Sequence, residues 1–77
     1  MKIEISFFGQ LTDKTGCNSI LMDNPGTITE FRNLVIKQYP NLSNAKFTIA
    51  LNNKIALDNE VIPKNAKLAL MPPFSGG

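Results

Sequence analysis

A single amphipathic helix between segments with β-strand alternation constrains the fold of this chain most. Residues 27–39 lie between the turn signal Asn24-Pro25-Gly26 and Pro40, which cannot continue a helix. Thr27 precedes Glu30 by three residues, the spacing of a capping box. Four residues at positions i, i+3, i+6 and i+7 form one predicted apolar stripe: Ile28, Phe31, Leu34 and Val35. Because the rest of the chain is mainly strand-like, this stripe must bury against strands.

Strands are predicted on both sides of the helix. Residues 2–8 alternate, with Ile3, Ile5 and Phe7 on one face and Phe8 on the other. The further strand candidates are residues 19–23, 47–51, 54–57 and 67–71. One helical turn is expected at 11–14 and an irregular segment at 58–65. Two strands, a crossover helix and further strands predict an α+β fold of the β-grasp, ubiquitin-like kind, with a mixed sheet packed on one main helix.

The length of 77 residues predicts one domain, spanning 1–77, with residues 71–77 as an extended tail. A chain of this size buries only about 60% of its extended surface. Cys17 is the only cysteine and histidine is absent, so neither an internal disulfide nor a metal site is expected. Cys17 could carry a persulfide, but nothing in its Gly-Cys-Asn setting indicates an activated thiol.

Charge and hydropathy indicate the cellular location of the chain and the kinds of partner it has. No apolar run reaches the roughly 18 residues of a membrane span, and there is no signal-peptide pattern, so we expect a cytoplasmic protein without a membrane partner. The net charge is +2, and the eight lysine and arginine residues are scattered. This distribution does not indicate a nucleic-acid partner.

The last six residues read Pro72-Pro73-Phe74-Ser75-Gly76-Gly77. Two prolines end a strand and favour a stiff extended segment, while Ser-Gly-Gly cannot pack. Such a segment reaches about 20 Å when extended. The slim tip suits threading into an enclosed site, although a Gly-Gly pair is also found at ordinary frayed ends.

The carboxylate of Gly77 is a poor acyl donor because its carbonyl carbon carries no good leaving group. It is an anion at neutral pH, since a terminal carboxyl has a pKa of about 3.5. An ATP-dependent partner could convert it to an acyl-adenylate, and sulfide or a persulfide could then displace AMP and leave a thiocarboxylate. Gly76 adds no Cβ that would hinder access to the carbonyl.

The chain resembles the ubiquitin-like sulfur carriers, and within them the small subunits of molybdopterin synthase. The resemblance rests on Phe7-Phe8-Gly9-Gln10, on the helix after a Pro-Gly turn, and on the Pro-Pro-Phe-Ser-Gly-Gly end. It covers residues 1–77. The residue before Pro72 is Met71, where the family often has Phe.

The resemblance implies a carrier subunit that is not itself an enzyme. An adenylating partner similar to ubiquitin-activating enzymes would activate Gly77 with ATP, and no cofactor would be bound stably by this chain. The thiocarboxylate would enter the active site of a large synthase subunit, where sulfur passes to a pterin precursor to form the molybdopterin dithiolene. The family implies two large and two small subunits.

Three apolar residues fall on the polar side of the strand alternation: Phe8, Ile55 and Met71. If the sheet is antiparallel at its centre, they share an exposed face with the root of the tail. An exposed apolar patch marks a partner site. The predicted partner-binding residues are therefore Phe8, Ile55, Met71, Pro72, Pro73, Phe74 and Ser75.

Other functions stay open at this point. The same tail could donate sulfur to thiazole synthesis or be conjugated to protein lysines. A different class is a β-grasp binding module, for which RNA is a candidate ligand. Salt-dependent RNA binding would favour the module, whereas a mass shift at the C-terminus would favour the carrier.

Overall fold

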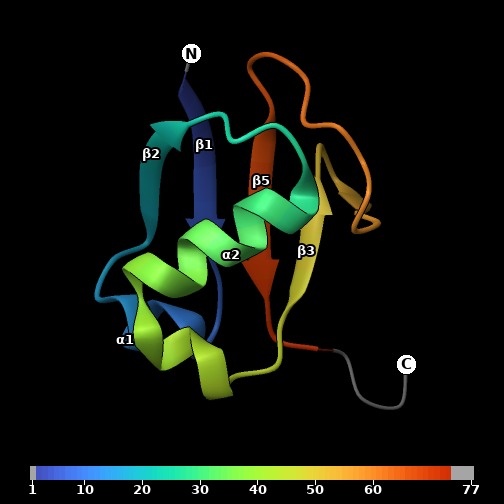
Figure 1. Cartoon of the computed structure of the whole chain (residues 1–77). Helices are drawn as coiled ribbons and strands as arrows, with labels where there is room; N and C mark the ends of the chain where they lie inside the picture. The colour runs from blue at the N-terminus through green and yellow to red at the C-terminus, as the bar shows by residue number, and fades with distance from the viewer. Residues whose placement is uncertain (1, 74–77) are drawn as a thin grey trace.

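The structure, a computed structural model, describes residues 2–73. Its elements follow the predicted order (Figure 1): β1 (Lys2–Phe7), α1 (Leu11–Thr15), β2 (Ser19–Asp23), α2 (Ile28–Gln38), the 3₁₀ helix η1 (Pro40–Asn44), β3 (Thr48–Leu51), β4 (Lys54–Ile55) and β5 (Lys67–Met71). The expected α+β, ubiquitin-like β-grasp fold is confirmed. Met71 is the last residue of β5, so the described part of the tail begins at Pro72.

Within the described residues the strands form one mixed sheet in the order β2-β1-β5-β3-β4. β1 pairs with β2 and β3 pairs with β5 in antiparallel fashion, whereas the central pair β1–β5 is parallel, with Phe7 opposite Leu70. From the sequence, we considered that the strands at the centre of the sheet pair in antiparallel fashion, and for β1 and β5 this is wrong. Parallel pairing brings the first and last strands together, which no local pattern of the sequence specifies.

α2 crosses one face of the sheet, and the core lies between them (Figure 1). The alternation of β1 supplies Ile3, Ile5 and Phe7, which are all buried. β5 adds Leu68 and Leu70, at 1% and 0% exposure. Because successive strand residues point to opposite faces, the intervening residues of β1 and β5 form the outer face.

The ends and the buried stripe of α2 follow its sequence. The Thr27 side chain accepts a hydrogen bond from the Glu30 backbone N–H at 3.3 Å, which confirms the predicted cap. The buried residues of α2 are Ile28, Phe31 and Val35. Leu34 was predicted to join them but is 43% exposed. It lies about 60° further around the helix than Phe31, which takes it past the contact with the sheet.

Several predicted boundaries shift by one or two residues. β1 ends at Phe7 and β4 ends at Ile55, one and two residues before their predicted ends. The turn between β3 and β4 places Asn52 and Asn53 at φ 50° and 73°, the positive values of a tight hairpin turn. η1 was not predicted, since Pro40 marked the end of α2 without indicating that a 3₁₀ turn follows.

Candidate functional site: the tail root and the outer face

The tail leaves from the middle of the sheet. β5 lies between β1 and β3, and its last residue, Met71, is followed by Pro72 and Pro73. Figure 1 shows this end of β5 at the same end of the sheet as the loop that follows β1. The proline pair, which we call the tail root, therefore starts from a strand that is fixed on both sides.

Gly9 holds a special position beside the tail root. Its φ is +60°, a backbone conformation that L side chains rarely adopt. A Cβ at Gly9 would lie 2.8 Å from Cγ and 3.3 Å from Cδ of Pro72. The absence of a side chain thus lets the loop after β1 pack directly on the Pro72 ring. This contact explains the glycine in the Phe-Phe-Gly-Gln segment, which the sequence marked only as a strand end.

Phe8 lies beside Met71 on the outer face. The β1–β5 ladder continues one bond past β1, since the Phe8 N–H donates to the Leu70 C=O at 3.0 Å. Phe8 therefore keeps the alternation of β1, and the parallel register that pairs Phe7 with Leu70 brings it next to Met71. The two residues share a face as predicted, although the parallel pairing that joins them was not expected.

A row of small residues continues this apolar face across the sheet. Ala69 of β5 is opposite Ser6 on one side and Ala50 on the other, and Ala50 is opposite Ile55. Paired residues point to the same face, so all four lie on the outer face. We define the outer-face patch as Phe8, Met71, Ala69, Ala50 and Ile55. Ala50 and Ala69 were missed from the sequence, where small residues gave no signal of a binding surface.

Exposure differs across the patch and the tail root. Phe8 and Ile55 are 50% and 62% exposed, whereas Ala50 is only 7% exposed and Met71 is half-buried. Pro72 is half-buried and Pro73 is exposed. The surface therefore has large apolar side chains at its ends and small ones between them. The predicted residues Phe74, Ser75, Gly76 and Gly77 lie outside the described residues.

Titratable groups do not assemble into a catalytic cluster in the described part of the chain. No group of three or more metal-ligating side chains occurs among residues 2–73. The Cys17 Sγ lies 3.8 Å from the Tyr39 hydroxyl, and burial, reinforced by this neighbour, raises the pKa of Tyr39. A phenol whose pKa is raised stays protonated at neutral pH, so Tyr39 offers no base.

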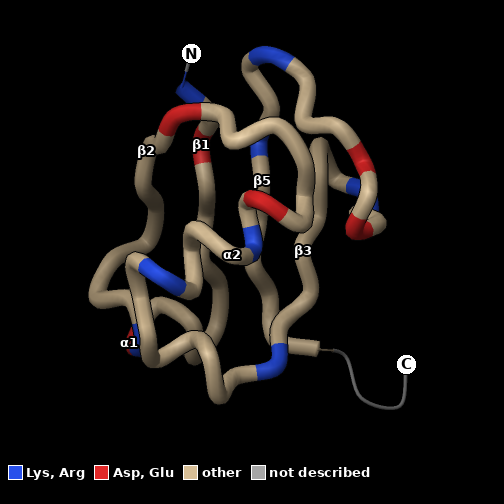
Figure 2. Tube along the Cα trace, viewed as in Figure 1, with Lys and Arg blue, Asp and Glu red and all other residues tan. Residues whose placement is uncertain are grey.

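The charged side chains are spread over the fold. Figure 2 shows Lys and Arg on strands, on α2 and in the loops. Two ion pairs occur among the described residues, Lys2 with Asp23 and Arg32 with Asp58, each at 3.1 Å. Among residues 2–73 the longest helix, α2, has 11 residues, and none of the helices could span a membrane.

Comparison with known proteins places the chain in a family. The model of the ThiS family matches residues 5–77, which includes β1 from Ile5 onward, the whole outer-face patch and the final Gly76-Gly77 pair. The chain belongs to the ThiS family. The resemblance inferred from the sequence is thereby confirmed at the level of the family.

Solved structures agree with this fold. The putative molybdopterin converting factor subunit 1 from Pyrococcus furiosus superposes with a TM-score of 0.89 at 12% identity, covering 96% of this chain and 99% of that one. SAMP1 from Haloferax volcanii gives 0.81 at 21% identity, with both chains fully covered. A chain from the complex of subunits 1 and 2 of the molybdopterin-converting factor from Helicobacter pylori gives 0.72 at 22% identity, with both chains fully covered. At these identities the likeness establishes the ubiquitin-like fold.

Proposed function

We propose that this ThiS-family protein is the sulfur-carrier subunit of a molybdopterin synthase, with the Gly77 carboxylate as the group that carries sulfur. The observation that supports it most is the arrangement at the end of β5. A proline-stiffened segment leaves the centre of the sheet, packs on Gly9 and begins beside an apolar patch in which Phe8 and Ile55 are exposed. A partner that binds the patch would receive the tail in a defined direction.

The chemistry divides between this chain and its partners. The carboxylate of Gly77 attacks the α-phosphorus of ATP on an adenylating partner, forming the acyl-adenylate and releasing pyrophosphate. Sulfide, or a persulfide followed by reduction with a thiol, then replaces AMP and leaves the thiocarboxylate. This chain contributes position and access rather than an acid or base.

The large subunit is the proposed receiver of the sulfur. In the Helicobacter pylori complex a related chain is assembled with subunit 2 of the molybdopterin-converting factor. By analogy, the outer-face patch docks on a large subunit and the tail passes sulfur to a pterin precursor there. The proposed assembly has two large and two small subunits. A cytoplasmic location suits this chemistry, since it requires ATP and a reducing environment.

The test uses Gly77 itself. The full-length protein, co-expressed with its adenylating enzyme, should show the mass of one oxygen-to-sulfur exchange. Deleting Gly77 leaves Gly76 as a terminal carboxylate of nearly the same acidity but shortens the reach by about 3.5 Å. Because a 1 Å misplacement can cost about 100-fold in rate, we expect loss of thiocarboxylation and of transfer with unchanged thermal stability. Full sulfur transfer by this variant would refute the carrier role of Gly77.

A second candidate function uses the same activated tail. SAMP1 from Haloferax volcanii is a small archaeal modifier protein by name, and its structure covers this chain completely. In a modifier, the amine of a lysine on the target would displace AMP from the acyl-adenylate and form an isopeptide bond. Peptide mass spectrometry of tryptic digests of cell extracts would detect target lysines that carry residues 68–77, because the last tryptic site of this chain is Lys67. Their presence without any thiocarboxylate would favour the modifier, and a thiocarboxylate used in thiazole synthesis would point to the thiamine branch.

A further inference from the structure

The outer edge of β2 offers unpaired backbone groups. Among residues 2–73, β2 pairs only with β1. The Phe7 N–H donates to the Asn18 C=O at 2.8 Å, so these two residues form a hydrogen-bonded pair. In the same register Ile5 lies opposite Ile20, two residues away on each strand. In an antiparallel pair, alternate residues turn their backbone groups toward the partner strand. Ser19, Leu21 and Asp23 therefore direct their N–H and C=O groups away from the sheet.

This edge lacks the features that protect most edge strands. Proteins blunt exposed edges with very short strands, prolines, bulges or charges directed inward. The opposite edge follows the rule, because β4 has only two residues, Lys54 and Ile55. β2 has five residues without proline, and Leu21 in its centre is 67% exposed. The β2 edge can thus accept a further strand.

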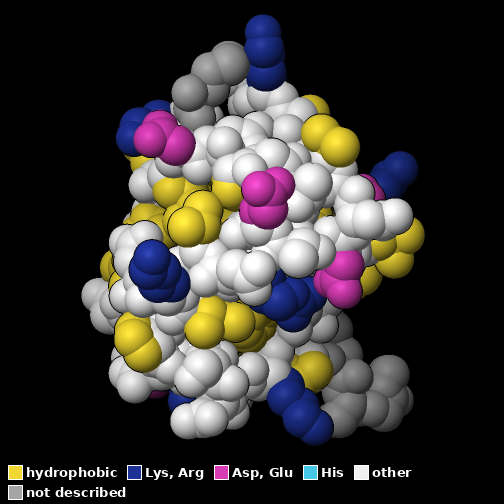
Figure 3. Space-filling model, viewed as in Figure 1, with side chains coloured by type: hydrophobic (Ala, Val, Ile, Leu, Met, Phe, Trp, Pro, Cys, Tyr) yellow, Lys and Arg dark blue, Asp and Glu magenta, His cyan; other side chains and the backbone are white. Residues whose placement is uncertain are grey.

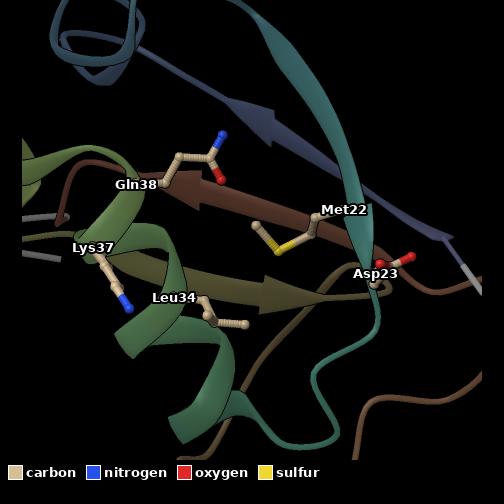
Figure 4. A pocket seen from close by; sticks show the side chains of 5 residues that line it. All are labelled: Met22, Asp23, Leu34, Lys37 and Gln38. Atoms are coloured by element: carbon tan, nitrogen blue, oxygen red, sulfur yellow. The ribbon is translucent and has the colours of Figure 1, made fainter.

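A groove runs beside this edge, between β2 and the C-terminal half of α2. Its volume is about 370 Å³, and its lining residues are Met22, Asp23, Leu34, Lys37 and Gln38. Figure 4 shows the Met22 side chain pointing from β2 toward α2, between Leu34 and Gln38. Figure 3 shows hydrophobic side chains around a cationic one at the left of the view, where β2 meets α2. The exposed Leu34 is thus a wall of the groove.

The charges of the groove favour an anionic occupant. Asp23 is neutralised by Lys2 at 3.1 Å. Lys37 has no carboxylate within ion-pair distance among residues 2–73, so its ammonium is the uncompensated charge of the lining. Its aliphatic stem can still cover apolar surface while the charged head stays in water. An occupant with apolar side chains and a carboxylate would match both properties.

We propose that the β2 edge and this groove bind an extended peptide segment of a partner protein, which adds a sixth strand beside β2. Its backbone would pair with Ser19, Leu21 and Asp23, its alternate apolar side chains would enter the groove between Met22 and Leu34, and an acidic residue would pair with Lys37. Strand addition takes affinity from the backbone bonds and specificity from alternate side chains. β1 separates this site from the tail root on β5, so the proposal does not depend on the sulfur-carrier function.

The experiment is an NMR titration of the full ¹⁵N-labelled chain with an acetylated, amidated heptapeptide of sequence Glu-Ile-Thr-Val-Thr-Leu-Glu. Its three apolar residues lie on one face, and it is acidic at both ends, so either strand direction is allowed. We expect saturable shifts and slowed hydrogen exchange at the amides of Ser19, Leu21 and Asp23. The same peptide N-methylated at Val and at the preceding Thr lacks a donor to β2 in either strand direction, because Thr donates in an antiparallel pair and Val in a parallel one, and it should bind at least 10-fold more weakly.

Matched variants test the side-chain contacts. Lys37→Glu should weaken binding of the acidic peptide by about 5-fold, the size of a surface ion pair, and should improve binding of a peptide with Lys at both ends. Lys64→Glu makes the same charge change on an exposed loop outside the groove. It should leave the peptide affinity unchanged, apart from the small effect of the altered net charge. Leu34→Ser should weaken binding while circular dichroism stays unchanged, because Leu34 is outside the core.

Two results would overturn the proposal. One is the absence of saturable shifts at the β2 amides with millimolar peptide. The other is a concentration-dependent dimer, seen by analytical ultracentrifugation, that shifts the same amides without peptide and excludes it. In that case a second copy of this chain occupies the edge.

Discussion

The helix-covered face and the outer face of the sheet both carry apolar residues near the end of β5, but they differ in what covers them. Leu68 and Leu70 lie under α2 at 1% and 0% exposure. On the outer face Phe8 is 50% and Ile55 62% exposed. Full burial of a large aliphatic side chain contributes about 1.5–3 kcal/mol. Because Phe8 and Ile55 stay exposed in the isolated chain, their side chains contribute little of this free energy to folding. Burial under a partner would make it available for binding.

The largest expected effect comes from the covered face. Leu70→Ala should lower the free energy of unfolding by about 2–5 kcal/mol, because it removes buried contacts and leaves a cavity. The measurement is urea denaturation, with the midpoint falling while the slope stays constant. Ile55→Ala, the matched truncation on the exposed face, should change stability by no more than about 0.5 kcal/mol. Equal losses for the two variants would remove the distinction between the faces.

A binding effect is expected from the outer face. Phe8→Asp and Ile55→Asp should each weaken docking of the proposed large subunit by about 2 kcal/mol, or roughly 30-fold, since a charge replaces an apolar anchor. Isothermal titration calorimetry with the purified partner measures this loss. Val61→Asp, which changes a side chain that is 71% exposed and outside the patch, serves as the control. If Val61→Asp weakens docking as much as Ile55→Asp does, the partner surface has been placed on the wrong residues.

The two faces were predictable from the sequence because strand alternation is local. The period of two assigned Ile3 and Ile5 to the core and Phe8 to the other side, and the structure agrees. The cap of α2 was also local, since Thr27 and Glu30 are three residues apart. Leu34 was misassigned because helical spacing gives the stripe but not its width, which depends on how α2 sits on the sheet.

What depended on distant contacts was not predictable. The parallel pairing of β1 with β5 joins residues more than sixty positions apart, and the alternation of each strand is the same for either direction. The contact of Gly9 with Pro72 depends on that pairing. Ala50 and Ala69 become part of a patch only when β3, β4 and β5 are placed in register. The sequence thus indicates which side chains are exposed, but not which of them meet.

The smallest expected effect tests whether the packing of Pro72 on Gly9 holds the tail root in place. Gly9 and Gly16 both have positive φ, +60° and +79°, so an alanine at either position costs about 1 kcal/mol or slightly more in backbone strain. A Cβ at Gly16 would meet nothing within 4 Å, whereas at Gly9 it would lie 2.8 Å from Pro72 Cγ. Gly16→Ala therefore measures strain alone, and Gly9→Ala measures strain plus displacement of the tail root.

We expect Gly9→Ala to lose more stability than Gly16→Ala in thermal denaturation, because its Cβ must also displace the ring of Pro72. They should also differ in sulfur transfer. Gly16→Ala should keep the rate of the unmodified protein, whereas Gly9→Ala should slow single-turnover transfer by several-fold to about 10-fold, since small misplacements of a reacting group are costly. Docking through Ile55 should persist in both. Equal transfer rates for the two alanine variants would mean that the Gly9–Pro72 contact does not direct the tail, and that the patch alone positions it.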